Sequence, residues 1–227
     1  MSFVLAALLF VSASAAPKAA KAVAQGFEAH YRGVRSMAGY FLEKYATGSS
    51  GIVVESGTVY FEKPGRMRWD YDSPETKMYL DDGKNIWFYV PADHTASRTS
   101  VKESSDWRTP LALLAGKANL ERLCGSLTLG SPAATGAKGG AASEVGDTVL
   151  VCGPRKADES IFQEVLLEVN SQNQLVRLDV RQPGDIEMDF HFGGWHENVP
   201  IEPARFRFEP PRGVAIVEDP QLGVKAQ

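Results

Sequence analysis

The most constraining feature of the chain is a strict alternation of side chains between Arg66 and Asp72. Bulky apolar residues stand at every second position, at Met67, Trp69 and Tyr71, and charged residues separate them. Successive side chains of a β-strand point to opposite faces, so this period of two predicts a strand with one apolar and one solvated face. The apolar face of this strand therefore carries bulky, adaptable side chains.

This strand belongs to a longer meander that extends from Gly57 to Tyr89. Three turn signals interrupt it, at residues 63–65 (Lys-Pro-Gly), 73–74 (Ser-Pro) and 81–84 (Asp-Asp-Gly-Lys). Proline and glycine at such breaks favour chain reversal, so neighbouring runs are expected to pair antiparallel.

Short alternating runs recur through the rest of the chain. They lie at residues 38–46, 52–62, 95–101, 123–129, 148–152, 164–169, 175–181, 185–192 and 205–208. Repeated alternation of this kind predicts an antiparallel sheet that is wet on one side. A sheet of roughly ten strands tends to curl or close. We therefore expect a mainly β fold with some α: a curved antiparallel sheet that forms an incomplete, unclosed β-barrel covered by short helices.

Two segments have helical patterns. Residues 20–37 place Val23, Phe27 and Tyr31 at helical spacing, which predicts an amphipathic helix packed on the sheet. Thr109 and Pro110 suit a helix start. The leucines that follow them, Leu111, Leu113 and Leu114, must be buried, and the mouth of a curled sheet is the natural place. A core helix and a gate over a ligand would use the same residues.

The first residues resemble a secretion signal. An apolar run at residues 3–11 is too short to span a bilayer, and small residues at 12–16 follow it. We predict a signal peptide at 1–15 and a single domain at 16–227, although Met1-Ser2 lacks the usual basic residue and a buried helix is the alternative. Without a cysteine near the cleavage site, the mature protein is expected to carry no lipid anchor.

Cys124 and Cys152 are the only cysteines, and they flank a loop rich in Gly, Ala and Ser at residues 130–146. An antiparallel hairpin centred near this loop would place them opposite each other, and an exported pair oxidises to a disulfide. A catalytic thiol and a metal pair are the alternatives, but neither has a supporting His or Cys nearby.

The chain offers little for catalysis or for nucleic acid. Its formal charge of −4 gives no electrostatic reason to bind nucleic acid. It has no Gly-x-Ser-x-Gly elbow and no His-Glu-x-x-His, and His191 and His196 would point to opposite faces of a strand. Acidic pairs such as Asp70 with Asp72, and the set Asp185, Glu187 and Asp189, lie opposite apolar stripes and are predicted to be solvated. We expect no catalytic residue, no metal site and no cofactor.

Several blocks resemble the outer-membrane lipoprotein carrier family. Residues 61–71 with 82–84 and 87–89 carry the first, 109–115 the second, and 206–214 the third. They occur in the family's order and together span the chain from about residue 34 to 216. The resemblance implies a monomeric periplasmic carrier that needs no cofactor. Such a carrier receives acylated lipoproteins from an inner-membrane ABC exporter and passes them to an outer-membrane receptor.

The resemblance also implies a ligand site. Met67 and Trp69 match the family's cavity pair, the 111–113 segment matches its lid helix, and the helix at 20–37 becomes part of the lid. The expected acyl cavity is formed by Val59, Phe61, Met67, Trp69, Tyr71, Leu111, Leu113 and Leu114. Lys63 stands where many members have an arginine implicated in lid closure and transfer, and it keeps the charge without the planar fork of donors. Each apolar residue taken alone could equally be ordinary core.

Two other functions remain open. One is a periplasmic sensor of lipid or mislocalised lipoprotein that signals to an anti-sigma partner. The other is a carrier of a different amphiphile, such as a glycolipid or a pigment.

Overall fold

The computed structural model describes residues 15–48, 51–101, 114, 120–130, 146–155 and 162–219. Most of the predicted signal peptide, most of the predicted loop at 130–146 and nearly all of the helix predicted to start at Thr109 and Pro110 therefore lie outside the described residues. Within the described part of the chain, no helix is long and apolar enough to cross a membrane.

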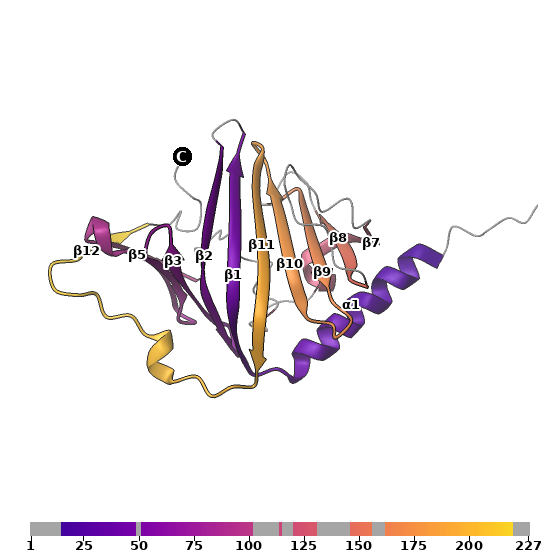
Figure 1. The fold of residues 1–227 in the computed structure, drawn as a ribbon, viewed down its shortest axis with the longest axis horizontal. Helices are drawn as coiled ribbons and strands as arrows, with labels where there is room; N and C mark the ends of the chain where they lie inside the picture. Colours follow the sequence, from indigo (N-terminus) through magenta and orange to yellow (C-terminus); the bar gives the residue numbers. More distant parts are fainter. Residues whose placement is uncertain are drawn as a thin grey trace, which may run out of the picture.

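A single sheet of twelve strands forms the body of the molecule (Figure 1). In chain order the strands are β1 (Ser36–Thr47), β2 (Ile52–Glu62), β3 (Arg66–Ser73), β4 (Lys77–Asp81), β5 (Asn85–Val90), β6 (Thr95–Ser100), β7 (Cys124–Leu129), β8 (Thr148–Pro154), β9 (Glu164–Val169), β10 (Leu175–Gln182), β11 (Ile186–Glu197) and β12 (Ala215–Glu218). Their order across the sheet is β12-β6-β5-β4-β3-β2-β1-β11-β10-β9-β8-β7. The sheet curves without closing, so the expected unclosed, mainly β architecture is confirmed.

The meander has the predicted connections. β2 and β3 pair antiparallel across the turn at residues 63–65, and β3 pairs in the same way with β4. Both ends of β2 coincide with the predicted run at 52–62. Period-two alternation is a local property of the sequence, which is why these elements could be placed from the sequence.

Helix α1 (Ala15–Gly33) packs against β7 and β8, and the short helix α2 (Leu120–Leu123) lies beside them (Figure 1). The buried stripe of α1 includes Ala24, Phe27 and Tyr31. The predicted helix at 20–37 ended too late, because β1 begins at Ser36.

Apolar side chains are buried on both faces of the sheet. The larger cluster fills the concave face and includes residues of α1, β1–β3 and β8–β11. A smaller cluster of Met78, Leu80, Trp87 and Phe206 involves β4, β5 and the segment after β11.

The predicted strand at 205–208 is wrong. Pro203–Phe206 forms a 3-10 helix, η5, and the residues after it have no regular structure until β12. Phe206 is buried against Met78, Leu80 and Trp87. Proline begins the 3-10 helix and recurs at residues 210–211, where it provides no N–H for a sheet ladder. β12 then pairs parallel with β6, the one parallel pair among the described strands.

The prediction of a wholly solvated second face is wrong around β10 and β11. Arg177, Asp179 and Asp189 are buried there, and Arg177 forms an ion pair with Asp189 at 2.6 Å. Burial, reinforced by the nearby Glu187 carboxylate, raises the pKa of Asp179 to about 7. For Asp189, burial opposes ionisation, but hydrogen bonds from His191 and Arg177 outweigh it and lower the pKa. The solvated acidic set predicted from the sequence therefore includes a buried, paired carboxylate.

Candidate functional site

The concave face brings together the five strand residues predicted to form an acyl cavity. Val59 and Phe61 come from β2, and they pair in register with Trp69 and Met67 of β3. Tyr71 follows on β3, and all five side chains are at most 3% exposed. In this structure they are packed among other side chains, so a ligand would have to displace some of these contacts.

Trp69 lies at the centre of this face, surrounded by aromatic rings. Its ring centroid is 4.8 Å from that of Phe41, 5.4 Å from Phe190, and 6.1 Å from both Phe61 and Phe192. The indole Nε1 is buried and has no hydrogen-bond partner among the described residues. The sequence alternation predicted the position of Trp69 but could not identify the rings from β1 and β11.

A polar band adjoins the aromatic group, and sequence reasoning did not identify it. The Tyr71 hydroxyl donates to the Glu43 carboxylate at 2.9 Å. Lys77 of β4 pairs with Glu55 of β2, and its Nζ lies 4.6 Å from the centre of the Tyr71 ring. Glu43 and Phe41 are two residues apart in β1, so their side chains lie on the same face of the sheet. This spacing was the sequence signal that the Glu43 carboxylate lies on the concave face.

The polar band lies toward the open end of the concave face. Tyr45 is one step beyond Glu43 along β1 and is half-buried, and its register partner Val53 is 47% exposed. This end of the sheet, with the β1–β2 and β10–β11 hairpins, lies opposite the C-terminal end of α1 (Figure 1). Along the strands, the concave face is therefore apolar and enclosed around Trp69, and it becomes polar and accessible toward the β1–β2 hairpin.

Lys63 connects the meander to α1. Its Nζ donates to the backbone carbonyls of Tyr31 and Arg32, in the last turn of the helix. Those carbonyls have no partner within the helix, and a cation is favourable at this end of the helix dipole. Partial burial lowers the pKa of Lys63. The Tyr31 hydroxyl in turn accepts a hydrogen bond from the backbone N–H of Leu175 at 2.9 Å, which links α1 to β10.

The predicted lid residues are described only in part. Leu114 is 2% exposed and belongs to the concave cluster. Leu111 and Leu113 lie outside the described residues.

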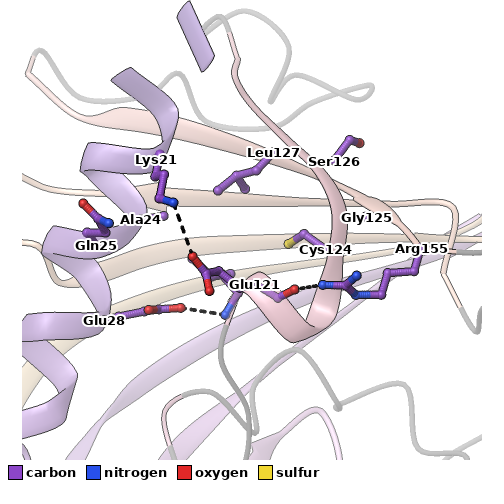
Figure 2. Close-up of a pocket in the computed structure, with 11 residues that line it drawn as sticks. Lys21, Ala24, Gln25, Glu28, Glu121, Cys124, Gly125, Ser126, Leu127 and Arg155 are labelled. Carbon is purple, nitrogen blue, oxygen red and sulfur yellow. Dashed lines mark hydrogen bonds and ion pairs between the residues drawn. The ribbon is translucent and has the colours of Figure 1, made fainter. Parts of the chain in front are cut away.

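A separate pocket of about 380 Å³ lies between α1, α2 and β7 (Figure 2). Charged and polar side chains supply much of its lining. Lys21 faces Glu121 at 3.7 Å, Glu28 accepts a hydrogen bond from the Leu120 N–H at 2.7 Å, and Arg155 donates to the Glu121 carbonyl. It does not include any of the predicted cavity residues, and its charged lining suits acyl chains less well than the concave face does.

Cys124 and Cys152 form a disulfide between β7 and β8. Cys124 also lines this pocket (Figure 2). The register differs from a simple hairpin, because Leu127 stands opposite Cys152, and Cys124 stands opposite Pro154 beyond an irregularity in the pairing. Within the described ranges, no cluster of three or more His, Cys, Asp or Glu residues could hold a metal ion.

Comparisons with known proteins agree with the resemblance carried by the sequence blocks. The family model "Outer membrane lipoprotein carrier protein LolA" matches residues 32–127. A protein of Nitrosospira multiformis named outer-membrane lipoprotein carrier protein is 29% identical over 170 residues, which cover 74% of each chain. One of the same name from Chromobacterium violaceum is 27% identical over 213 residues, which cover 94% of this chain and 95% of that one.

Among solved structures, an uncharacterized conserved protein from Thermus thermophilus shares the fold. Its TM-score is 0.53 at 12% sequence identity, over 88% of this chain and 99% of that one. The sequence matches, which include the whole meander and extend over most of the chain, confirm the resemblance to the outer-membrane lipoprotein carrier family.

Proposed function

We propose that this protein is a periplasmic carrier of lipoproteins that shields their acyl chains on the concave face of its sheet. The observation that carries the proposal is the convergence of Val59, Phe61, Met67, Trp69 and Tyr71 on one apolar face of an unclosed sheet. The names of the relatives support the same role. The finer expectation is a shuttle that accepts cargo from an inner-membrane ABC exporter and delivers it to an outer-membrane receptor.

Acyl chains match this face in chemistry. Each CH₂ group removed from water contributes about 0.8 kcal/mol, so a lipoprotein anchor with several chains needs no strong directional contact to bind. Met67 adapts to irregular shapes because its thioether side chain is unbranched and polarizable. The aromatic residues provide flat walls beside it. Binding of this kind requires no covalent step and no cofactor.

Access to the face requires part of its cover to move. The side chains of α1 and Leu114 belong to the concave cluster, so they are the groups that acyl chains would replace. Lys63 holds the C-terminal end of α1 through the carbonyls of Tyr31 and Arg32. We infer that this contact favours the closed arrangement and that its loss favours opening, which is the lid and transfer role expected for Lys63.

The test is release of lipoprotein from membranes. Mature protein beginning at Ala16 is incubated with spheroplasts that bear newly made acylated lipoprotein, and the soluble fraction is assayed for a complex. Wild type should release the lipoprotein and Trp69→Glu should not. Leu42→Glu is the matched control, because Leu42 of β1 lies on the other face of the sheet and is 37% exposed.

Circular dichroism and a melting curve would show that each variant is folded. If folded wild type releases no lipoprotein, the carrier proposal is wrong. If such protein still binds fluorescent acyl probes, the result favours a sensor or a carrier of another amphiphile.

A further inference from the structure

The indole N–H of Trp69 is a hydrogen-bond donor without an acceptor. Trp69 is 0% exposed, and its Nε1 has no partner among the described residues. Buried tryptophan N–H groups usually find a partner, because a donor removed from water without a replacement acceptor costs free energy. Phenylalanine would provide a similar apolar wall without this cost. The donor is therefore unexplained by packing alone.

The chemistry of the donor restricts what would pair with it. An indole N–H only donates, so its partner must be an acceptor. The surrounding rings of Phe41, Phe61, Phe190 and Phe192 supply no oxygen or nitrogen. A ligand that enters among these rings would be mostly hydrocarbon. It would carry one hydrogen-bond acceptor next to the Trp69 indole N–H. A carbonyl oxygen of an acyl ester or amide has this form.

The adjacent charges favour a neutral carbonyl over a carboxylate. Phe41 contacts both Trp69 and Tyr71, with ring centroids 4.8 and 4.9 Å apart, and Tyr71 donates to the buried carboxylate of Glu43. Glu55 and Lys77 pair with each other in the same band. An anion entering among the rings would be removed from water and placed beside the Glu43 and Glu55 carboxylates, and both burial and nearby like charges disfavour its charged form. A free fatty acid is thus a poorer match than its ester.

We propose that Trp69 donates a hydrogen bond to the carbonyl oxygen of the ester or amide that joins an acyl chain to a lipid anchor. This inference rests on the proposed carrier function and adds that the face recognises the acyl linkage as well as the hydrocarbon. The acyl chain extends from Trp69 toward Phe61 and Met67. The polar end of the anchor extends toward Glu43 and Glu55, near the accessible end of the face.

The experiment compares two probes that differ only in the carbonyl. 1-Palmitoylglycerol has an ester, and 1-O-hexadecylglycerol has the same chain length and head group joined by an ether. Affinities are measured by displacement of a fluorescent fatty acyl probe from wild type and from Trp69→Phe. Wild type should bind the ester about 3- to 10-fold more tightly than the ether, the ratio expected for one neutral hydrogen bond. Trp69→Phe should bind both probes equally.

A spectroscopic measurement identifies the donor directly. With ¹⁵N-labelled tryptophan, the indole resonance that disappears in Trp69→Phe should move downfield with the ester and not with the ether. Trp87 provides the internal control, because its Nε1 already faces Asp82 at 3.4 Å and its side chain belongs to the other cluster. Its resonance should be unchanged by either probe.

The outcomes separate this inference from the function on which it rests. Equal affinity of wild type for ester and ether would overturn the hydrogen bond and leave the carrier function standing. An ester preference that persists in Trp69→Phe would overturn the role of Trp69. Tighter binding of palmitate anion than of the ester would overturn the neutral-carbonyl assignment. If wild type binds no acyl probe at all, the carrier function itself fails.

Discussion

The hydroxyl of Tyr71 on β3 donates a hydrogen bond to the Glu43 carboxylate on β1, 2.9 Å away, although β2 lies between the two strands. Gly57 explains this contact. It stands on β2 opposite Tyr71 on one side and opposite Phe41 on the other. Because Gly57 has no side chain, the side chains of β1 and β3 meet across it, and the Phe41 and Tyr71 rings lie 4.9 Å apart.

Replacing Tyr71 by Phe should destabilise the protein. The substitution removes one donor from a buried carboxylate while keeping the aromatic ring, and a lost hydrogen bond to a buried charged group costs about 1–3 kcal/mol. The free energy of unfolding, measured by urea titration, should fall by this amount. Tyr40→Phe is the control, because Tyr40 is 65% exposed and the same change there should alter stability by less than about 0.5 kcal/mol. Equal effects at the two positions would contradict the role of the Glu43 contact.

Gly57→Ala should be among the most damaging small substitutions in the meander. A Cβ at Gly57 would lie 1.9 Å from the backbone carbonyl oxygen of Asp70. Relieving that overlap requires β2 and β3 to separate, so we expect a loss of about 2 kcal/mol or more, as for other overpacking changes. Gly33→Ala has open space around its added Cβ and should have little effect on the melting temperature. A Gly57→Ala variant as stable as wild type would show that the two strands yield easily.

Lys63→Met should loosen the C-terminal end of α1. The variant keeps much of the aliphatic length but removes the ammonium that binds the carbonyls of Tyr31 and Arg32. Hydrogen exchange of backbone amides in the last turns of α1 should become faster by about 3- to 10-fold, the equivalent of one modest hydrogen bond. Lys63→Arg should restore most of the protection, since it retains the charge. Unchanged exchange in Lys63→Met would mean that packing alone holds this end of the helix.

Reduction of the disulfide should lower stability. The bridge between Cys124 and Cys152 closes a loop with a sequence separation of 28 residues. In the chain-entropy model a loop of that length contributes about 3–4 kcal/mol. Thermal unfolding with and without dithiothreitol measures this difference. The Cys124→Ser/Cys152→Ser double variant should melt near reduced wild type and should not respond to dithiothreitol.

Asp179 should make stability depend on pH. Its folded-state pKa of about 7 lies above its ordinary value of 3.8, chiefly because of burial and the neighbouring Glu187. A carboxyl with a raised pKa contributes stability fully below pH 4, and this contribution is lost as the pH rises through about 7. Each unit of difference in pKa corresponds to about 1.4 kcal/mol.

The variant that tests this is Asp179→Asn. Relative to wild type, it should gain stability between pH 5 and pH 8, as followed by melting temperature at each pH. Asp72→Asn, at an exposed position, should follow the wild-type curve. If wild type and Asp179→Asn differ by the same amount at every pH, Asp179 does not titrate in this range.

The elements that depend on local pattern could be predicted from the sequence. The alternation around Met67, Trp69 and Tyr71, the turn at residues 63–65 and the limits of β2 follow from side-chain periodicity and from proline and glycine. Short-range patterns determine these features because the side chains of a strand alternate whatever it pairs with. The resemblance of the sequence blocks then indicated the class of carrier.

The tertiary structure alone determined which charged groups are buried and which aromatic rings meet. Glu43 is enclosed because β1 lies beside β2 and β11, and Trp69 contacts Phe190 from a strand more than 110 residues away in the chain. Phe206 lies in a 3-10 helix and not in the predicted strand, because its side chain is buried against Met78 and Leu80. Burial and contact depend on the packing of distant segments, and the periodicity of a short segment contains no information about its distant neighbours.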